Sequence, residues 1–193
     1  MNEKSELHII TALSRVGNLP ALLAAVSPAA ESFDLMWHIV HDCGSAPCRF
    51  GYERRSWLRL SHAYVKKSIV GNAQKNKALD AIKSGLVWVL DDDNLPAVGF
   101  FEELAKLDDA HPDADVFLFA QLRAGEVVQP KPEIGSIDAA QMVARRKAIG
   151  SLRFPLDVYA SDGHVITRLC AKAGTRVVSV DRPLTLYNAL RPQ

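Results

Sequence analysis

The stretch Ser84–Pro96, SGLVWVLDDDNLP, sets a short apolar run directly against three consecutive aspartates. The run Leu86–Leu90 has the length and the β-branched and aromatic content of a fully buried strand. Asp91, Asp92 and Asp93 would then follow its carboxyl end. In open α/β sheets ligands bind at the carboxyl ends of the strands, so this stretch predicts both a fold class and the place of a site.

Three adjacent carboxylates repel one another, and at the end of a buried strand this repulsion is poorly screened. A divalent cation would relieve it, because Mg²⁺ and Mn²⁺ prefer oxygen ligands and leave positions open for substrate phosphates. In strand geometry Asp91 and Asp93 point to one face and Asp92 to the other. One aspartate would then bind the metal and the other a neighbouring hydroxyl. The alternative is an acidic turn, which Asn94 and Pro96 favour.

Around this stretch, apolar runs alternate with helical patterns. Strands are predicted at Leu7–Leu13, Asp34–Asp42, Ala63–Ser68, Leu86–Leu90, Asp115–Arg123, Ala139–Arg146 and Thr175–Val180, and helices after Asn18, after Asn72, within Leu95–Ala114 and from Ser161. The segments Cys43–Ser61 and Ala124–Ser136 lack clean periodicity, and we expect a loop and a flexible rim there. The alternation predicts an α/β fold with a mixed, mainly parallel sheet between helices.

Size and composition describe an ordinary globular protein. The 193 residues suffice for one core, and we expect a single domain over residues 1–193. The balance of 23 Lys+Arg against 22 Asp+Glu argues against a generally basic nucleic-acid binder. No apolar run approaches the about 18 residues of a membrane span, and the three cysteines show no CxxC spacing. We expect a cytoplasmic location, with peripheral membrane association left open because lipid-linked substrates need no spanning helix.

The segment Gly71–Leu104 resembles the central segment of nucleotide-sugar-dependent glycosyltransferases of the A-type fold. Its GNAQKNKAL pattern precedes a hydrophobic strand and a DxD motif, as in family 2 transferases, and QKNKALD followed by DDDN is also similar to the animal glucuronyltransferases. The segment His8–Val26 resembles the family's first strand, ribose-side loop and first helix. The resemblance runs from about Leu7 to Leu107, more weakly to about Tyr187, and implies a single Rossmann-like nucleotide-diphospho-sugar transferase domain.

The resemblance also implies which residues bind a UDP- or GDP-sugar. The expected set is Thr11, Ala12, Leu13, Arg15, Asp42, Asn72, Lys75, Asn76, Asp91 and Asp92. The first four belong to the nucleotide loop, Asp42 would contact the base or ribose, and Asp91 the ribose or donor sugar. Lys75 would lie beside the diphosphate, the alternative being a helix-surface lysine without a partner. Asp93 is expected to bind Mn²⁺ or Mg²⁺ directly.

The downstream half offers the remaining candidates. The segment Gly135–Ile149 resembles the strand that forms the floor of the acceptor region in family 2 enzymes, with Gln141 or Met142 facing the site. Asp162 falls where inverting members carry their catalytic base, although Ser161 replaces the usual first acid of that pair. The alternative makes Ser161 or Asp162 a helix cap. His164 is a second candidate metal ligand, or else an exposed residue of the first helical turn.

The resemblance therefore implies a metal-dependent glycosyltransferase that inverts the anomeric carbon and uses a saccharide, lipid-linked or protein acceptor. Tyr52, Arg54, Arg55, Trp57 and Arg59 could contact RNA, but a solvated loop or a diphosphate contact is favoured, and no nucleic-acid partner is expected. A nucleotidyltransferase of related fold is one alternative, although TALSRVGNLP has few glycines for its phosphate loop. A non-catalytic nucleotide-sugar-binding module is the other.

Overall fold

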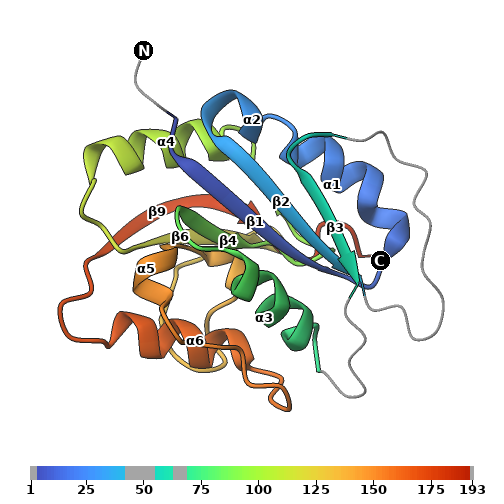
Figure 1. Ribbon diagram of the computed structural model, residues 1–193. Helices are drawn as coiled ribbons and strands as arrows, with labels where there is room; N and C mark the ends of the chain where they lie inside the picture. Colours follow the sequence, from blue (N-terminus) through green and yellow to red (C-terminus); the bar gives the residue numbers. More distant parts are fainter. Residues whose placement is uncertain (1–3, 42–54, 63–68, 192–193) are drawn as a thin grey trace.

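The structure, a computed structural model, describes residues 4–41, 55–62 and 69–191. Within these residues one sheet has the strand order β3-β2-β1-β4-β8-β6-β9-β5, and β7 pairs with β6 (Figure 1). The strands are β1 Glu6–Leu13, β2 Asp34–His41, β3 Leu58–His62, β4 Leu86–Val89, β5 Leu95–Pro96, β6 Val116–Arg123, β7 Glu126–Val128, β8 Met142–Arg145 and β9 Val177–Leu186. The strand expected at Ala63–Ser68 lies outside the described residues.

The long ladders of the sheet are parallel. β1 pairs in parallel with β2 and β4, β2 with β3, and β6 with β9. β8 lies between β4 and β6 and runs antiparallel to both, and the short strands β5 and β7 are also antiparallel to their neighbours. The expected α/β fold with a mixed, mainly parallel sheet is confirmed.

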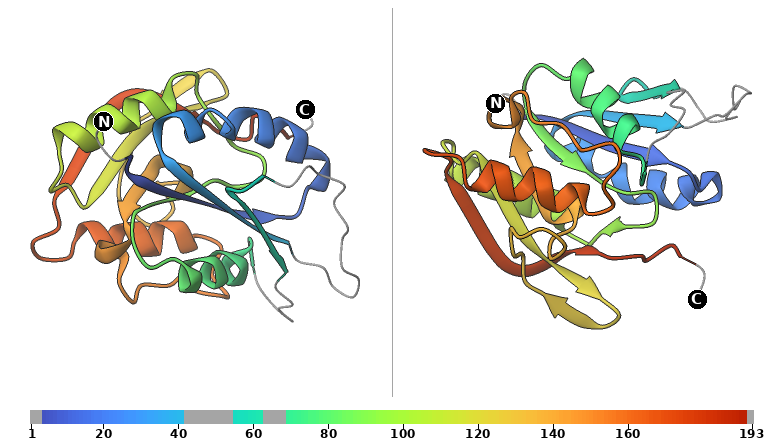
Figure 2. Two further views of the ribbon diagram at one scale, coloured as in Figure 1. Left: turned by 45° about the horizontal axis from the view of Figure 1, so that its top comes forward. Right: turned by 90° about the horizontal axis from the view of Figure 1, so that it is seen from below.

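Helices cover both faces of the sheet (Figures 1 and 2). The α-helices are α1 Leu19–Val26, α2 Ala29–Ser32, α3 Asn72–Ala81, α4 Phe100–Ala110, α5 Arg146–Ile149 and α6 Ser161–Cys170, and short 3-10 helices occur at Val16–Asn18 and Ala139–Gln141. In β1, Leu7 and Ile9 pack with α1, α2 and α4, whereas Ile10 packs on the opposite face with α3, α5 and α6. None of the helices within the described ranges is long and apolar enough to cross a membrane.

The start of α3 depends on a glycine. Gly71 precedes the helix with φ +73°, a backbone conformation that is strained for any residue with a side chain. A Cβ at this position would lie 2.4 Å from the Cβ of Ala12 in β1. The glycine therefore lets the first turn of α3 lie against the carboxyl end of β1, and this contact places Lys75 near the aspartates.

The backbone of the aspartates differs from the strand geometry expected for them. β4 ends at Val89, and the N–H of Asn94 donates to the Asp91 carbonyl at 3.1 Å, so Asp92 and Asp93 lie in a turn. The prediction that strand alternation sets the directions of these side chains is wrong. The Asp92 carboxylate holds this turn against the end of β1 by accepting hydrogen bonds from the backbone N–H groups of Ser14 and Arg15.

Two other expectations need correction. β3 lies partly in the segment expected to be a loop, where Leu58 and Leu60 alternate with polar residues and extend the sheet beyond β2. β7 lies in the segment expected to be a flexible rim, because Glu126–Val128 pairs with the end of β6 in a hairpin.

Candidate functional site

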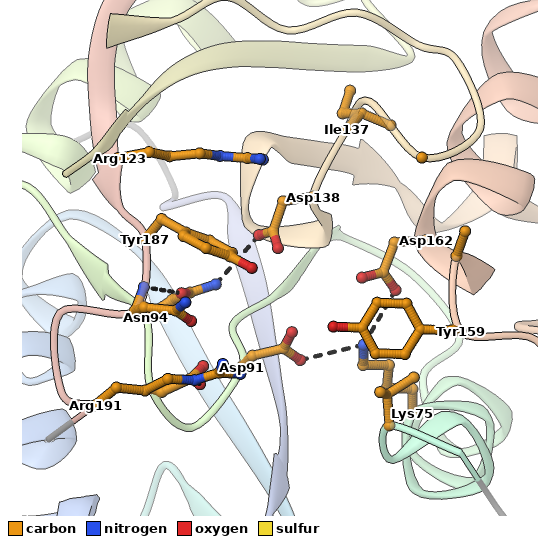
Figure 3. A pocket seen from close by; sticks show the side chains of 15 residues that line it. Lys75, Asp91, Asn94, Arg123, Ile137, Asp138, Tyr159, Asp162, Tyr187 and Arg191 are labelled. Carbon is orange, nitrogen blue, oxygen red and sulfur yellow. Dashed lines mark hydrogen bonds and ion pairs between the residues drawn. The ribbon is translucent and has the colours of Figure 1, made fainter. Parts of the chain in front are cut away.

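A cavity of about 300 Å³ lies at the carboxyl ends of the central strands (Figure 3). Acidic side chains enter it from three separate segments: Asp91 follows β4, Asp138 precedes β8, and Asp162 belongs to the first turn of α6. One oxygen of each lies within 4.8 Å of an oxygen of the others. The fold therefore gathers carboxylates that are far apart in the sequence.

Lys75 provides a buried positive charge among these acids. Its side chain is 1% exposed, and its ammonium lies 3.1 Å from an oxygen of Asp91 and 3.1 Å from an oxygen of Asp162. The ammonium also lies 5.3 Å from the centre of the Phe154 ring. Burial disfavours the ammonium, but the two carboxylates outweigh that cost and raise the pKa of Lys75. The alternative of a surface lysine without a partner is wrong.

One ammonium does not balance the acidic group. Burial and the negative charges of Asp162 and Asp138 raise the pKa of Asp91 to about 7, although Lys75 acts in the opposite direction. Burial and the charge of Asp162 also raise the pKa of Asp138. Carboxylate oxygens with uncompensated charge are suitable ligands for Mg²⁺ or Mn²⁺, so the residues present fit a divalent cation.

A second cavity of about 290 Å³ adjoins the first, and Val70, Asp91, Asp93 and Arg191 line both. Its other walls come from the end of β1 and from α3. They comprise Ala12, Leu13, Ser14, Arg15, Gly71, Gln74 and Asp92. We call it the loop cavity and the first one the acidic cavity.

Asp92 and Asp93 have separate partners. Asp92 is buried and accepts from the N–H groups of Ser14 and Arg15 at 2.6 Å each, and from the Arg15 guanidinium at 2.5 Å. It therefore fixes the loop after β1. Asp93 forms ion pairs with Arg15 at 3.3 Å and with Arg191 at 2.5 Å.

The structure brings together most, but not all, of the residues expected to bind the donor. Ala12, Leu13, Arg15, Asp91 and Asp92 line the loop cavity, and Lys75 lines the acidic cavity. Thr11 lies beneath them, fully buried, where its hydroxyl donates to the Leu90 carbonyl and accepts from the Trp37 indole. Asp42 lies outside the described residues.

Asn72 and Asn76 line neither cavity and instead hold the segment before α6. The Asn72 amide donates to the carbonyls of Pro155 and Val158, and its oxygen accepts from Ser161. Asn76 donates to the Phe154 carbonyl and accepts from its N–H. These bonds position the start of α6, and hence Asp162.

Among the candidates near α6, Asp162 lies in the acidic cavity and His164 does not line it. No side-chain capping bond occurs at the start of α6, so the alternative of a helix cap at Ser161 or Asp162 is not supported by a hydrogen bond there. Within the described residues neither Asp93 nor His164 belongs to the carboxylate group that could share one ion. Their metal-binding roles stay predictions.

Sequence reasoning missed Asp138, Arg123, Tyr187 and Arg191, which all line the acidic cavity. Asp138 had a recognisable signal, because Asp138 and Gln141 have the spacing of a capping box and form one in the structure. The others had no local signal, since β6 and the chain after β9 reach the site only through the sheet order.

Comparison with known proteins adds the fold family. No protein-family model and no curated protein sequence matches the chain. The crystal structure of S. aureus TarS 1–349 in complex with UDP-GlcNAc matches with a TM-score of 0.69 and 15% identity, over 94% of this chain and 58% of that one. A mannosyltransferase from Pyrobaculum calidifontis in complex with GDP-Man and Mn²⁺ matches with a TM-score of 0.65 and 17% identity, over 97% of this chain and 58% of that one.

The chain thus has the fold of glycosyltransferases that bind nucleotide sugars, as the sequence resemblance implied. At these identities the likeness concerns the fold alone. The chain also spans less than two thirds of the length of either matched protein.

Proposed function

We propose that the protein is a metal-dependent glycosyltransferase that moves a sugar from a nucleoside-diphosphate donor to an acceptor hydroxyl. The observation that carries this proposal is the group of Asp91, Lys75 and Asp162 in the acidic cavity, directly beside the loop cavity. TarS 1–349 was solved with UDP-GlcNAc and the mannosyltransferase with GDP-Man, which supports a UDP- or GDP-sugar as the donor.

The loop cavity is the proposed nucleotide site. Backbone and side chains from Ala12 to Arg15 form one wall, and the guanidiniums of Arg15 and Arg191 would face the diphosphate. The donor sugar would then lie at the junction of the two cavities, beside Asp91. Arginine suits this role because its fixed fork of donors matches phosphate oxygens.

Asp162 is the proposed base. Its side chain is 17% exposed and lines the acidic cavity, so an acceptor hydroxyl can reach it. Lys75 holds this carboxylate through a hydrogen bond of 3.1 Å. A single base that takes the acceptor proton during in-line attack gives inversion at the anomeric carbon.

Asp93 is the proposed metal ligand, with Asp91 beside it at the junction of the cavities. Its partner Arg191 is 47% exposed and can move aside, whereas Lys75 is buried within the other carboxylate group. Mn²⁺ or Mg²⁺ would offset the charge of the departing nucleoside diphosphate.

Calorimetry with Mn²⁺ and a panel of nucleoside diphosphates tests the proposal. We expect metal-dependent binding of UDP or GDP, and its loss in Asp93→Ala. Asp109→Asn is the matched control, because Asp109 is exposed on α4 and lines neither cavity, and it should keep metal-dependent binding. Absence of metal-dependent binding to every nucleotide would refute the proposed function.

Hydrolysis of the donor sugar tests the base without knowledge of the acceptor, because water can replace the acceptor hydroxyl. Asp162→Asn should bind the nucleotide as the wild type does and lose turnover. Turnover at the wild-type rate in this variant would exclude Asp162 as the base. Nucleotide binding without turnover in the wild type, with any acceptor tried, would favour a non-catalytic binding module.

A further inference from the structure

Arg123 differs from the other cations of the acidic cavity. Lys75 pairs with Asp91 and Asp162, and Arg191 pairs with Asp93. Arg123 also lines the cavity, but over the described ranges it takes part in no ion pair. Its charge is therefore available to a ligand.

The Arg123 guanidinium is held in place by neutral partners. Its Nε donates to the Gln121 side-chain oxygen at 2.8 Å, and one terminal nitrogen donates to that of Gln141 at 3.1 Å. Both glutamines are 0% exposed. The guanidinium also stacks on Tyr187, with 4.6 Å between its carbon and the ring centre. A guanidinium fixed in this way, with donors remaining, is suited to a carboxylate or phosphate.

With the nucleotide in the loop cavity, as proposed above, Arg123 lies outside the diphosphate site. Arg123 lines the acidic cavity and not the loop cavity. Figure 3 shows it on the far side of Asp138 from Lys75 and Asp162. A group bound by Arg123 would thus belong to the sugar that occupies the acidic cavity. The carboxylates of that cavity would repel an acidic sugar, and a dedicated cation would be needed to admit one.

We propose that Arg123 binds a carboxylate or phosphate carried by the sugar substrate, so that the protein selects an acidic sugar over its neutral analogue. This inference rests on the proposed function and extends it to the substrate class. Tyr187 contributes by holding one face of the guanidinium.

Paired ligands test the proposal in two arms. In the donor arm, calorimetry with Mn²⁺ compares UDP-glucuronate with UDP-glucose, and GDP-mannuronate with GDP-mannose. In the acceptor arm, the protein saturated with UDP or GDP is titrated with methyl glucuronide or glucose 6-phosphate, each against methyl glucoside. We expect an acidic member to bind about tenfold more tightly or better in one arm, because charged hydrogen bonds have this order of strength. The arm that responds tells whether the anion belongs to the donor or the acceptor.

Variants assign the preference to Arg123. Arg123→Gln should abolish it, and Arg123→Lys should keep only part of it, because the ammonium cannot form the same fork of bonds. Arg182→Gln, at an exposed position of β9 outside both cavities, is the matched control and should keep it. Thermal unfolding of each variant checks that the fold persists, and Arg123→Lys keeps the test valid if Arg123→Gln is unstable.

Equal binding of acidic and neutral members in both arms would overturn the proposal, as would an acid preference that persists in Arg123→Gln. A loss of Mn²⁺ affinity in Arg123→Gln with equal effects on acidic and neutral ligands would also overturn it, because Arg123 would then serve only to balance the aspartates. Metal-dependent nucleotide binding without acid preference leaves the proposed function intact. Arg123-dependent binding of acidic sugars without nucleotide binding refutes the proposed function alone.

Discussion

Replacement of Lys75 by methionine tests whether the buried ammonium holds the acidic group together. Methionine keeps much of the length of the side chain and its packing on Phe154 but removes the charge 3.1 Å from both Asp91 and Asp162. Removal of one partner from a buried ion pair costs about 3–5 kcal/mol. Because the Asp91 and Asp162 side chains remain 30% and 17% exposed, water screens part of the loss. We expect about 3 kcal/mol at pH 8, the lower end of that range.

The cost should decrease as the pH falls. Asp91 has a pKa raised to about 7 with the ammonium in place, and the pKa rises further without it. Folded Lys75→Met therefore holds a proton at pH values where the folded wild type has released it. Each extra proton changes the difference in unfolding free energy by about 1.4 kcal/mol per pH unit. The destabilisation at pH 6 should be about 1–2 kcal/mol smaller than at pH 8.

Lys75 itself does not contribute to this pH dependence. Its pKa is raised in the folded protein, so the stability that it provides is fully present below its unfolded pKa of about 10.4 and is lost only as the pH rises through the folded value. Between pH 6 and 8 the difference in stability between Lys75→Met and the wild type therefore reports on the carboxylates beside Lys75, because contributions common to both proteins cancel.

Urea unfolding followed by circular dichroism, at pH 6, 7 and 8, measures these differences. Lys106→Met is the matched control, because Lys106 is exposed on α4, and it should change the unfolding free energy by less than about 0.5 kcal/mol. A loss below about 1 kcal/mol for Lys75→Met at pH 8 would refute the reasoning, and so would a loss of equal size at every pH.

Three further predictions concern single contacts. Asp92→Ala should lower the unfolding free energy by about 3 kcal/mol in urea titrations, because it leaves two backbone N–H groups without their acceptor and removes one of the two carboxylates that pair with the Arg15 guanidinium. Asp92→Asn, which keeps one acceptor oxygen, should lose less, and equal losses would contradict this account. Gly71→Ala should lower the unfolding free energy by at least about 1 kcal/mol more than Gly174→Ala. Both glycines have a positive φ, but only a Cβ at Gly71 would meet another atom, the Cβ of Ala12 at 2.4 Å, so equal melting temperatures of the two variants would show that this contact relaxes freely. Arg191→Gln should raise the affinity for Mn²⁺ alone about threefold to fivefold in calorimetry, because it frees Asp93 from a half-exposed ion pair, and unchanged affinity would place the ion elsewhere.

The parts of the fold that were predictable from the sequence have local causes. The run Leu86–Leu90 is apolar because β4 is buried on both faces, and the alternation of such runs with helical patterns is sufficient to predict an α/β fold. The helix from Ser161 was predictable for the same reason, since its apolar residues recur with helical spacing. These patterns depend only on neighbouring residues and on burial.

The contents of the acidic cavity depend on long-range geometry. Asp138 reaches Asp91 because β8 is inserted antiparallel between β4 and β6, whereas Asp162 does so because Asn72 and Asn76 hold the segment before α6. No short pattern encodes either arrangement. Asp92 and Asp93 are chemically identical neighbours, yet one fixes the loop after β1 and the other pairs with Arg191 near the end of the described chain. A turn, unlike a strand, does not fix the directions of successive side chains by period, so sequence alone could not assign these two roles.

The polar face of α3 shows how a motif can be recognised before its physical role is known. The pattern GNAQKNKAL led us to expect Asn72, Lys75 and Asn76 beside a nucleotide. Of these three residues only Lys75 lines a cavity, and the two asparagines bind the chain that leads into α6. Because Asn72 also accepts from Ser161, next to the proposed base, the polar side chains of the motif fix α3 against α6. The ammonium is thereby set between Asp91 and Asp162, so the motif supports the proposed chemistry mainly by positioning the acids.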